Sequence, residues 1–144
     1  MAELERFIPA RAVWAVSTLG LTVVLVLAAW LEPDPRGLGT HTQLGLPPCG
    51  FLWLTGLPCP GCGLTTSFAL MAAGEWLRAF RTQPLGVLLY ALCVFAWPVC
   101  AAGWIRGWSV HATLSRLPVY TVALGLSLLA LFNWCVRLVS MWLA

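Results

Sequence analysis

The chain has 144 residues, of which 60% are hydrophobic and only 9% are charged. A soluble domain carries about 25% charged residues, so this composition indicates an integral membrane protein and the lipid bilayer as its main partner. The net charge of +3 comes from arginines that flank apolar segments, which is not the basic face that binds nucleic acid. We therefore exclude nucleic acid as a partner.

The first predicted membrane span is 13–31, a run of 19 residues without a charge. As an α-helix it would be about 28 Å long, close to the roughly 30 Å of a bilayer's hydrocarbon core. Trp30 and Leu31 stand where signal-peptide cleavage requires small residues, so we expect an uncleaved anchor. Prolines then end the helix, and a polar connection, 32–48, follows.

The segment 63–81 allows two interpretations. Its first half is apolar, Gly74 and Glu75 interrupt it, and an amphipathic turn follows. An apolar run of about 10 to 14 residues is more often re-entrant or interfacial than spanning. We favour one short re-entrant or interfacial helix, and a fourth membrane span is the alternative.

Two further spans are predicted at 85–105 and 118–138. The first opens after Pro84, a residue favoured in the first turn of a helix, and Pro98 within it predicts a kink. Arg137 is expected to extend towards the interface near the end of the second. The predicted fold class is thus an all-α integral membrane protein, a single membrane domain over 1–144, with three transmembrane helices and one short helix (alternative: four spans).

Arginines around the first span indicate its orientation. Arg6 and Arg11 precede it, whereas only Arg36 follows it closely, and positive residues favour the cytoplasmic side. We expect a cytoplasmic N-terminus. The connection after the first span then lies on the non-cytoplasmic side under either topology.

Six cysteines fall into two groups. Three lie within the predicted spans, where we interpret them as small apolar packing residues: Cys93, Cys100 and Cys135. The others, Cys49, Cys59 and Cys62, lie in the longer connection 32–62, before a predicted helix start. The amides and dipole of that helix start are expected to lower the pKa of a nearby thiol. Its first amides are expected to be capped by hydroxyl side chains, those of Thr65, Thr66 and Ser67.

Three uses of these thiols stay open. Cys59 and Cys62 form a C-x-x-C pair suited to thiol redox chemistry, with Cys49 as a third partner. Cys49, Cys59, Cys62 and His41 would make a zinc-type ligand set, although their intervals are not those of a standard zinc finger. The third use is a structural disulfide or a packed loop of reduced cysteines. The expected cofactor is therefore zinc or none. Haem attachment is excluded because Gly63, not His, follows Cys62.

A longer pattern extends over 49–84. It consists of a leading cysteine, a Thr-Gly pair, a Cys-Pro-x-Cys-Gly-x-Thr motif, a glycine and a proline before a span: Cys49, Thr55, Gly56, Cys59, Pro60, Cys62, Gly63, Thr65, Gly74 and Pro84. This pattern resembles the bacterial membrane-protein family catalogued as domain of unknown function 2752. The chain departs from that family at Thr66, Glu75 and Gln83, where the resemblance implies Arg, Asp and Asn. Any anion site based on that Arg is therefore not carried over.

The resemblance implies a multi-pass protein of the bacterial inner membrane and no assigned activity. The sequence contains no complete catalytic constellation, which favours a non-enzymatic role. We expect an accessory or structural membrane component, a subunit of a larger assembly with other membrane proteins. The alternatives are a membrane thiol–disulfide oxidoreductase that uses Cys59 and Cys62, and a metal-binding membrane protein.

Overall fold

The computed structural model of the protein describes residues 9–115 and 118–143, and within these residues it contains helices and no strand. The elements in chain order are α2 (Ala10–Trp30), the 3-10 helix η1 (Thr40–Leu44), α3 (Gly50–Thr55), α4 (Leu64–Ala72), α5 (Trp76–Thr82), α6 (Pro84–Arg106), α7 (Val110–Leu114) and α8 (Val119–Leu143).

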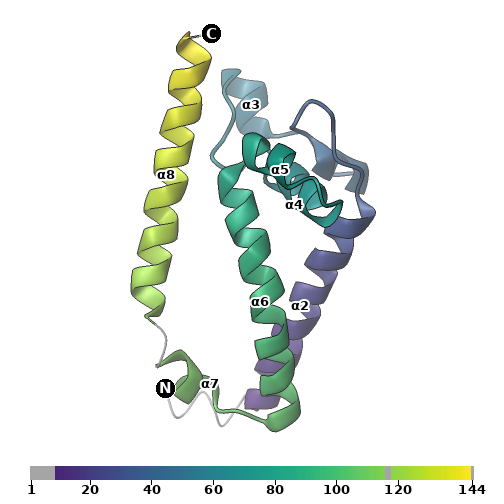
Figure 1. Ribbon diagram of the computed structural model, residues 1–144, viewed down its shortest axis with the longest axis vertical. Coiled ribbons are helices and arrows are strands. Elements are labelled where there is room, and N and C mark those ends of the chain that lie inside the picture. Colours follow the sequence, from purple (N-terminus) through teal and green to yellow (C-terminus); the bar gives the residue numbers. More distant parts are fainter. Residues whose placement is uncertain (1–8, 116–117, 144) are drawn as a thin grey trace.

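Three of these helices, α2, α6 and α8, are long and apolar enough to cross a membrane. The helix α6 contacts both α2 and α8 and runs between them (Figure 1). Few of their side chains are covered by protein, so large apolar surfaces remain for lipid. The expected fold class, all-α with three long apolar helices, is confirmed, and it fits a multi-pass membrane protein.

The contact between α2 and α6 depends on a close approach at a glycine. A Cβ atom at Gly103 would lie 2.7 Å from the ring of Trp14, so the indole packs directly on the backbone of α6. The indole N–H of Trp14 donates to the carbonyl of Trp108 at 2.8 Å. Further along, Trp97 Nε1 donates to Thr22 Oγ1 at 2.8 Å. These bonds satisfy polar groups that lipid cannot.

The segment 63–81 forms two short helices instead of one. Gly74, with a φ of +79°, separates α4 from α5. Their 9 and 7 residues correspond to about 14 and 11 Å, too short to cross about 30 Å of hydrocarbon. Both helices lie at the end of the bundle where α6 begins (Figure 1). The four-span alternative therefore has no support, and this segment is a pair of short helices at one end.

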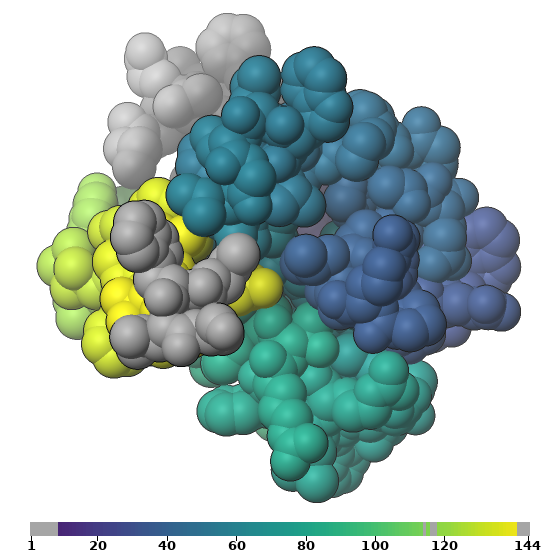
Figure 2. Space-filling model, turned by 90° about the horizontal axis from the view of Figure 1, so that it is seen from above, coloured from purple at the N-terminus to yellow at the C-terminus, as the bar shows by residue number. Residues whose placement is uncertain are grey.

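The protein core also lies at this end. Its most deeply buried residues, each at most 1% exposed, come from the α2–α3 connection, α4, α5 and the start of α6: Thr40, Thr66, Ser67, Ala69, Leu70, Ala79 and Gln83. Viewed onto this end, the molecule shows the blue segments of the connection, the green start of α6 and the yellow end of α8 gathered together (Figure 2). The cysteine motif is part of this compact end.

Candidate functional site

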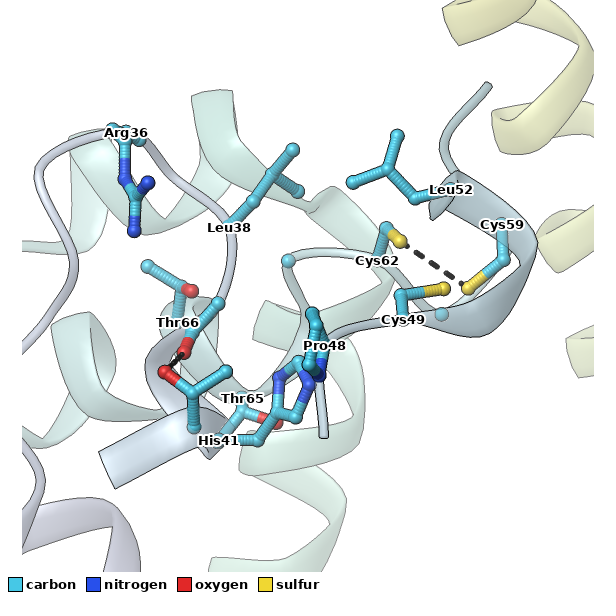
Figure 3. Close-up of a pocket in the computed structure, with 14 residues that line it drawn as sticks. Arg36, Leu38, His41, Pro48, Cys49, Leu52, Cys59, Cys62, Thr65 and Thr66 are labelled. Carbon is cyan, nitrogen blue, oxygen red and sulfur yellow. Dashed lines mark hydrogen bonds between the residues drawn. The ribbon is translucent and has the colours of Figure 1, made fainter. Parts of the chain in front are cut away.

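Three cysteines from two segments converge at this end of the molecule. The sulfur atoms of Cys49, Cys59 and Cys62 all lie within 4.8 Å of one another, and all three are free thiols. Cys49 directly precedes α3, whereas the other two belong to the turn before α4. The three sulfurs face a common point, and the Cys59 and Cys62 sulfurs are 3.3 Å apart (Figure 3).

The turn that holds the pair is built from short-range hydrogen bonds and one glycine. The amide of Cys62 donates to the carbonyl of Cys59, and that of Leu64 to Gly61, each at 3.0 Å. Gly63 adopts a φ of +86°, and a Cβ there would lie 3.0 Å from the carbonyl oxygen of Gly37. Only glycine combines this left-handed backbone with such a close approach.

The last helix holds the turn from the other side. Trp134 Nε1 donates to the carbonyl of Pro58 at 2.8 Å, and Arg137 Nη1 donates to the carbonyl of Cys62 at 2.6 Å. These carbonyls have no partner within the turn's own short-range bonds. Side chains of α8 therefore satisfy backbone groups that would otherwise be costly to bury.

Gln83 joins the turn to α8. Its side chain is fully buried. Its amide nitrogen donates to the carbonyl of Pro60 at 2.9 Å, and its amide oxygen accepts from Asn133 Nδ2 at 2.7 Å and from Arg137 Nη1 at 3.4 Å. One residue thus fixes the position of the cysteine turn relative to both α6 and α8.

The thiols of Cys49 and Cys62 differ in acidity. The backbone amide of Leu52 and the thiol of Cys62 lower the pKa of Cys49 to about 7. Burial raises the pKa of Cys62 to about 12, and hydrogen bonds with Cys59 and Cys49 add to the rise. The expectation that the helix start lowers the pKa of the nearby thiol is therefore wrong for Cys62, because this residue is only 7% exposed and its burial disfavours the charged thiolate.

The predicted hydroxyl cap of α4 is also wrong. Gly63 is the N-cap residue, and no side chain caps the helix. Thr66 Oγ1 instead bonds Thr40 Oγ1 at 2.8 Å, and Ser67 Oγ donates to the carbonyls of Gln83 and Ala79 at 3.1 and 3.2 Å. Because both residues are buried, their hydroxyl groups bond to neighbouring segments and so connect α4 to them.

His41 does not join the cysteines. His41 and the three cysteines line one cavity of about 520 Å³. Within it, His41 lies apart from the sulfurs, near Pro48 and Thr65 (Figure 3). The ligand set suggested by the sequence is therefore reduced to three sulfurs. Cys93, Cys100 and Cys135 lie on α6 and α8, outside the cluster.

Sequence reasoning missed the residues that support the site from a distance. Gln83 was noted only as a departure from the family pattern, and Arg137 was assigned to the interface. A usable signal was present, since Asn133 and Arg137 are four residues apart on a largely apolar helix. Such residues share one face, and polar side chains within membrane segments usually face protein.

Comparison with known proteins identifies this part of the chain. Residues 49–97 match the family model described as "Protein of unknown function (DUF2752)". No curated protein and no solved structure matches the chain. The matched residues include all three clustered cysteines, Gln83 and the first half of α6. Residues 49–97 are therefore similar to the DUF2752 family, which confirms the resemblance inferred from the sequence.

Proposed function

We propose that this protein is a membrane component whose Cys49, Cys59 and Cys62 thiolates bind one thiophilic metal ion, zinc or copper(I). The observation that carries the proposal is the convergence of three sulfurs within 4.8 Å of one another. A tetrahedral zinc–sulfur bond of about 2.3 Å places its sulfurs about 3.8 Å apart. The cluster therefore needs only small shifts to hold an ion.

The rest of the site suits such an ion. A disulfide uses two thiols, whereas this site brings in a third from a separate segment, in front of α3. The fourth coordination position would face the cavity that His41 also lines. Binding must release the thiol protons, and Cys49, whose pKa is lowered to about 7, loses its proton more readily than Cys62, whose pKa is raised to about 12.

The role we assign to the ion is structural, in an accessory component of a larger assembly of the bacterial inner membrane. The metal would tie α3 to the turn before α4. In the proposed orientation, with a cytoplasmic N-terminus, the cysteine end faces the exported side. Alkylation of metal-free Cys49 in intact cells by a membrane-impermeant maleimide tests this orientation, and labelling only after the membrane is opened contradicts it.

The metal content of purified protein tests the proposed function. We expect one zinc or copper ion per chain by elemental mass spectrometry, and loss of that ion in Cys62→Ser. Cys135→Ser is the matched control, because Cys135 is exposed on α8 and should leave the metal in place. Intact, folded protein that binds neither ion when it is supplied contradicts the proposal.

A second candidate function, thiol–disulfide exchange, rests on the distance of 3.3 Å between the Cys59 and Cys62 sulfurs. Closing this pair into a disulfide would release two electrons and two protons to an oxidant such as a quinone. Alkylation with and without reductant or chelator separates the two functions. Protection removed by a chelator supports the metal, and protection removed by a reductant supports the disulfide.

A further inference from the structure

A second cavity lies beside the cysteine turn and has a different chemical character. Its volume is about 390 Å³. The cavity is lined by the connection after α2, by α4, by α5 and by the end of α8, and its charged lining residues are Asp34, Arg36, Arg78, Arg81 and Arg137. Four of the chain's eight basic residues thus meet around one hollow.

The positive charges at this cavity exceed the negative ones. Arg36 pairs with Asp34, with Nη2 and Oδ2 2.8 Å apart, and Arg78 pairs with Glu75. These pairs leave the charges of Arg81 and Arg137 unbalanced within the part of the chain that the structure describes.

Among the described residues, Arg137 donates to neutral oxygens alone, the carbonyl of Cys62 and the amide oxygen of Gln83. The four guanidinium groups therefore carry a net charge of about +2 after the two carboxylates are counted. A cavity with an excess of positive charge, partly enclosed by protein, attracts an anion.

The geometry points to a binding site for an anionic phosphate group in this cavity. Arginine presents a planar fork of N–H donors that matches phosphate oxygens and is less strongly hydrated than an ammonium group. The hydroxyl of Thr82, which also lines the cavity, offers a further donor. This site involves none of the cysteine side chains, although Arg137 also donates to the carbonyl of Cys62.

The cavity's position suggests where the phosphate comes from. Arg78 and Arg81 lie on α5, whose side chains Trp76, Leu77 and Phe80 are exposed. Such an amphipathic helix lies at the interface with its apolar side in the lipid, and basic pockets near membrane helices bind lipid headgroups. A phosphate diester of an anionic lipid and a soluble phosphate share the chemistry that this site recognises.

Binding to the full chain, purified and delipidated in a neutral maltoside detergent, tests the site. One arm titrates inorganic phosphate against chloride at equal ionic strength by calorimetry. The other arm adds phosphatidylglycerol or phosphatidylcholine and counts bound lipid by native mass spectrometry. Binding in the first arm alone identifies a soluble source, and preference for phosphatidylglycerol in the second identifies a lipid source. Either result supports the site.

Variants connect the binding to the named residues. We expect Arg81→Gln to weaken binding about tenfold and the double variant R78Q/R81Q to weaken it further, since each loses charged hydrogen bonds. Arg106→Gln is the control, because Arg106 is at the opposite end of α6, and helical content by circular dichroism verifies folding. The proposal is overturned if wild-type protein binds neither probe above its control, or if Arg106→Gln weakens binding as much as Arg81→Gln.

Discussion

Arg137 Nη1 lies 2.6 Å from the carbonyl oxygen of Cys62, and this bond joins the last helix to the cysteine turn across 75 positions of sequence. The guanidinium of Arg137 also lines the second cavity, the proposed phosphate site. A charged donor to a part-buried carbonyl is stronger than a neutral one, so this contact should contribute measurably to the position of both the turn and α8.

Replacing Arg137 with glutamine should loosen the turn. A charged hydrogen bond contributes about 1.5 to 3 kcal/mol, and we expect a loss of that size in the free energy of unfolding, measured by denaturant titration in mixed micelles. Bound metal should also dissociate faster. Ser140→Ala is the control, because Ser140 is exposed and bonds only the carbonyl of Arg137. Equal stability of R137Q and S140A would contradict the assigned contact.

Replacing Gln83 with leucine tests the buried junction. The change removes both the donor to Pro60 and the acceptor for Asn133, leaving buried polar groups without partners at a cost of about 1 to 3 kcal/mol each. Asparagine, the residue that the family resemblance implies here, keeps the amide but is one methylene shorter. We expect Gln83→Asn to be less destabilised than Gln83→Leu in the same unfolding assay. The reverse order would contradict the hydrogen bonds assigned to the Gln83 side chain.

The packing of α4 on α6 is tested at Gly86. A Cβ there would lie 2.7 Å from Cβ and Oγ of Ser67, and Ser67 is fully buried. We expect Gly86→Ala to lower the thermal midpoint, since overpacking a tight contact costs about 1 to 3 kcal/mol. The matched control is Gly125→Ala on α8, where no atom lies within 4 Å of the new Cβ and helix propensity favours alanine. A Gly86→Ala midpoint at or above that of Gly125→Ala would mean that α4 and α6 are less tightly packed.

Thiol reactivity in metal-free, reduced protein should follow the acidities in the cluster. The thiolate is the reactive form, and the pKa of Cys49 is lowered to about 7. Its alkylation should therefore be fast above about pH 7 and slow down as the pH falls below that value. Cys62, with a pKa raised to about 12, should stay unlabelled until strongly alkaline pH.

Peptide mass spectrometry after brief iodoacetamide pulses from pH 5 to 9 measures these rates. Cys49→Ser should remove the rapidly labelled peptide, and Cys62 should still be labelled slowly, because burial is the largest cause of its raised pKa. Labelling of Cys62 before Cys49 at pH 7 would refute the predicted order.

The sequence was most informative where composition alone determines structure. Long uncharged runs and the prolines beside them predicted the three long helices, because a bilayer selects for apolar length. The break at Gly74 was visible as well, but one helix with an interruption was predicted where the structure has α4 and α5. The presence of a glycine in a sequence does not show whether the helix bends at that residue or ends there.

The details of the site depend on contacts between distant segments, which periodicity does not encode. Cys62 was expected to be acidified by a helix start, yet its burial has the larger effect. Ser67 was expected to cap α4 and instead bonds carbonyls 12 and 16 positions away. His41 was expected near the cysteines and Arg137 at the interface, yet Arg137 is the one that contacts the cysteine turn. The paths of the connection and of α8 decide this, and the sequence pattern does not show those paths.

The bond between α8 and the cysteine turn also sets an order of events during synthesis. Chains emerge from the ribosome at about 5 to 20 residues per second, so Arg137 follows Cys62, 75 positions earlier, by about 4 to 15 s. During that interval the carbonyls of Pro58 and Cys62 lack the partners that α8 later supplies. The thiol cluster therefore reaches its final form only after the last helix has inserted, and metal loading is expected to be a late step in the maturation of this protein.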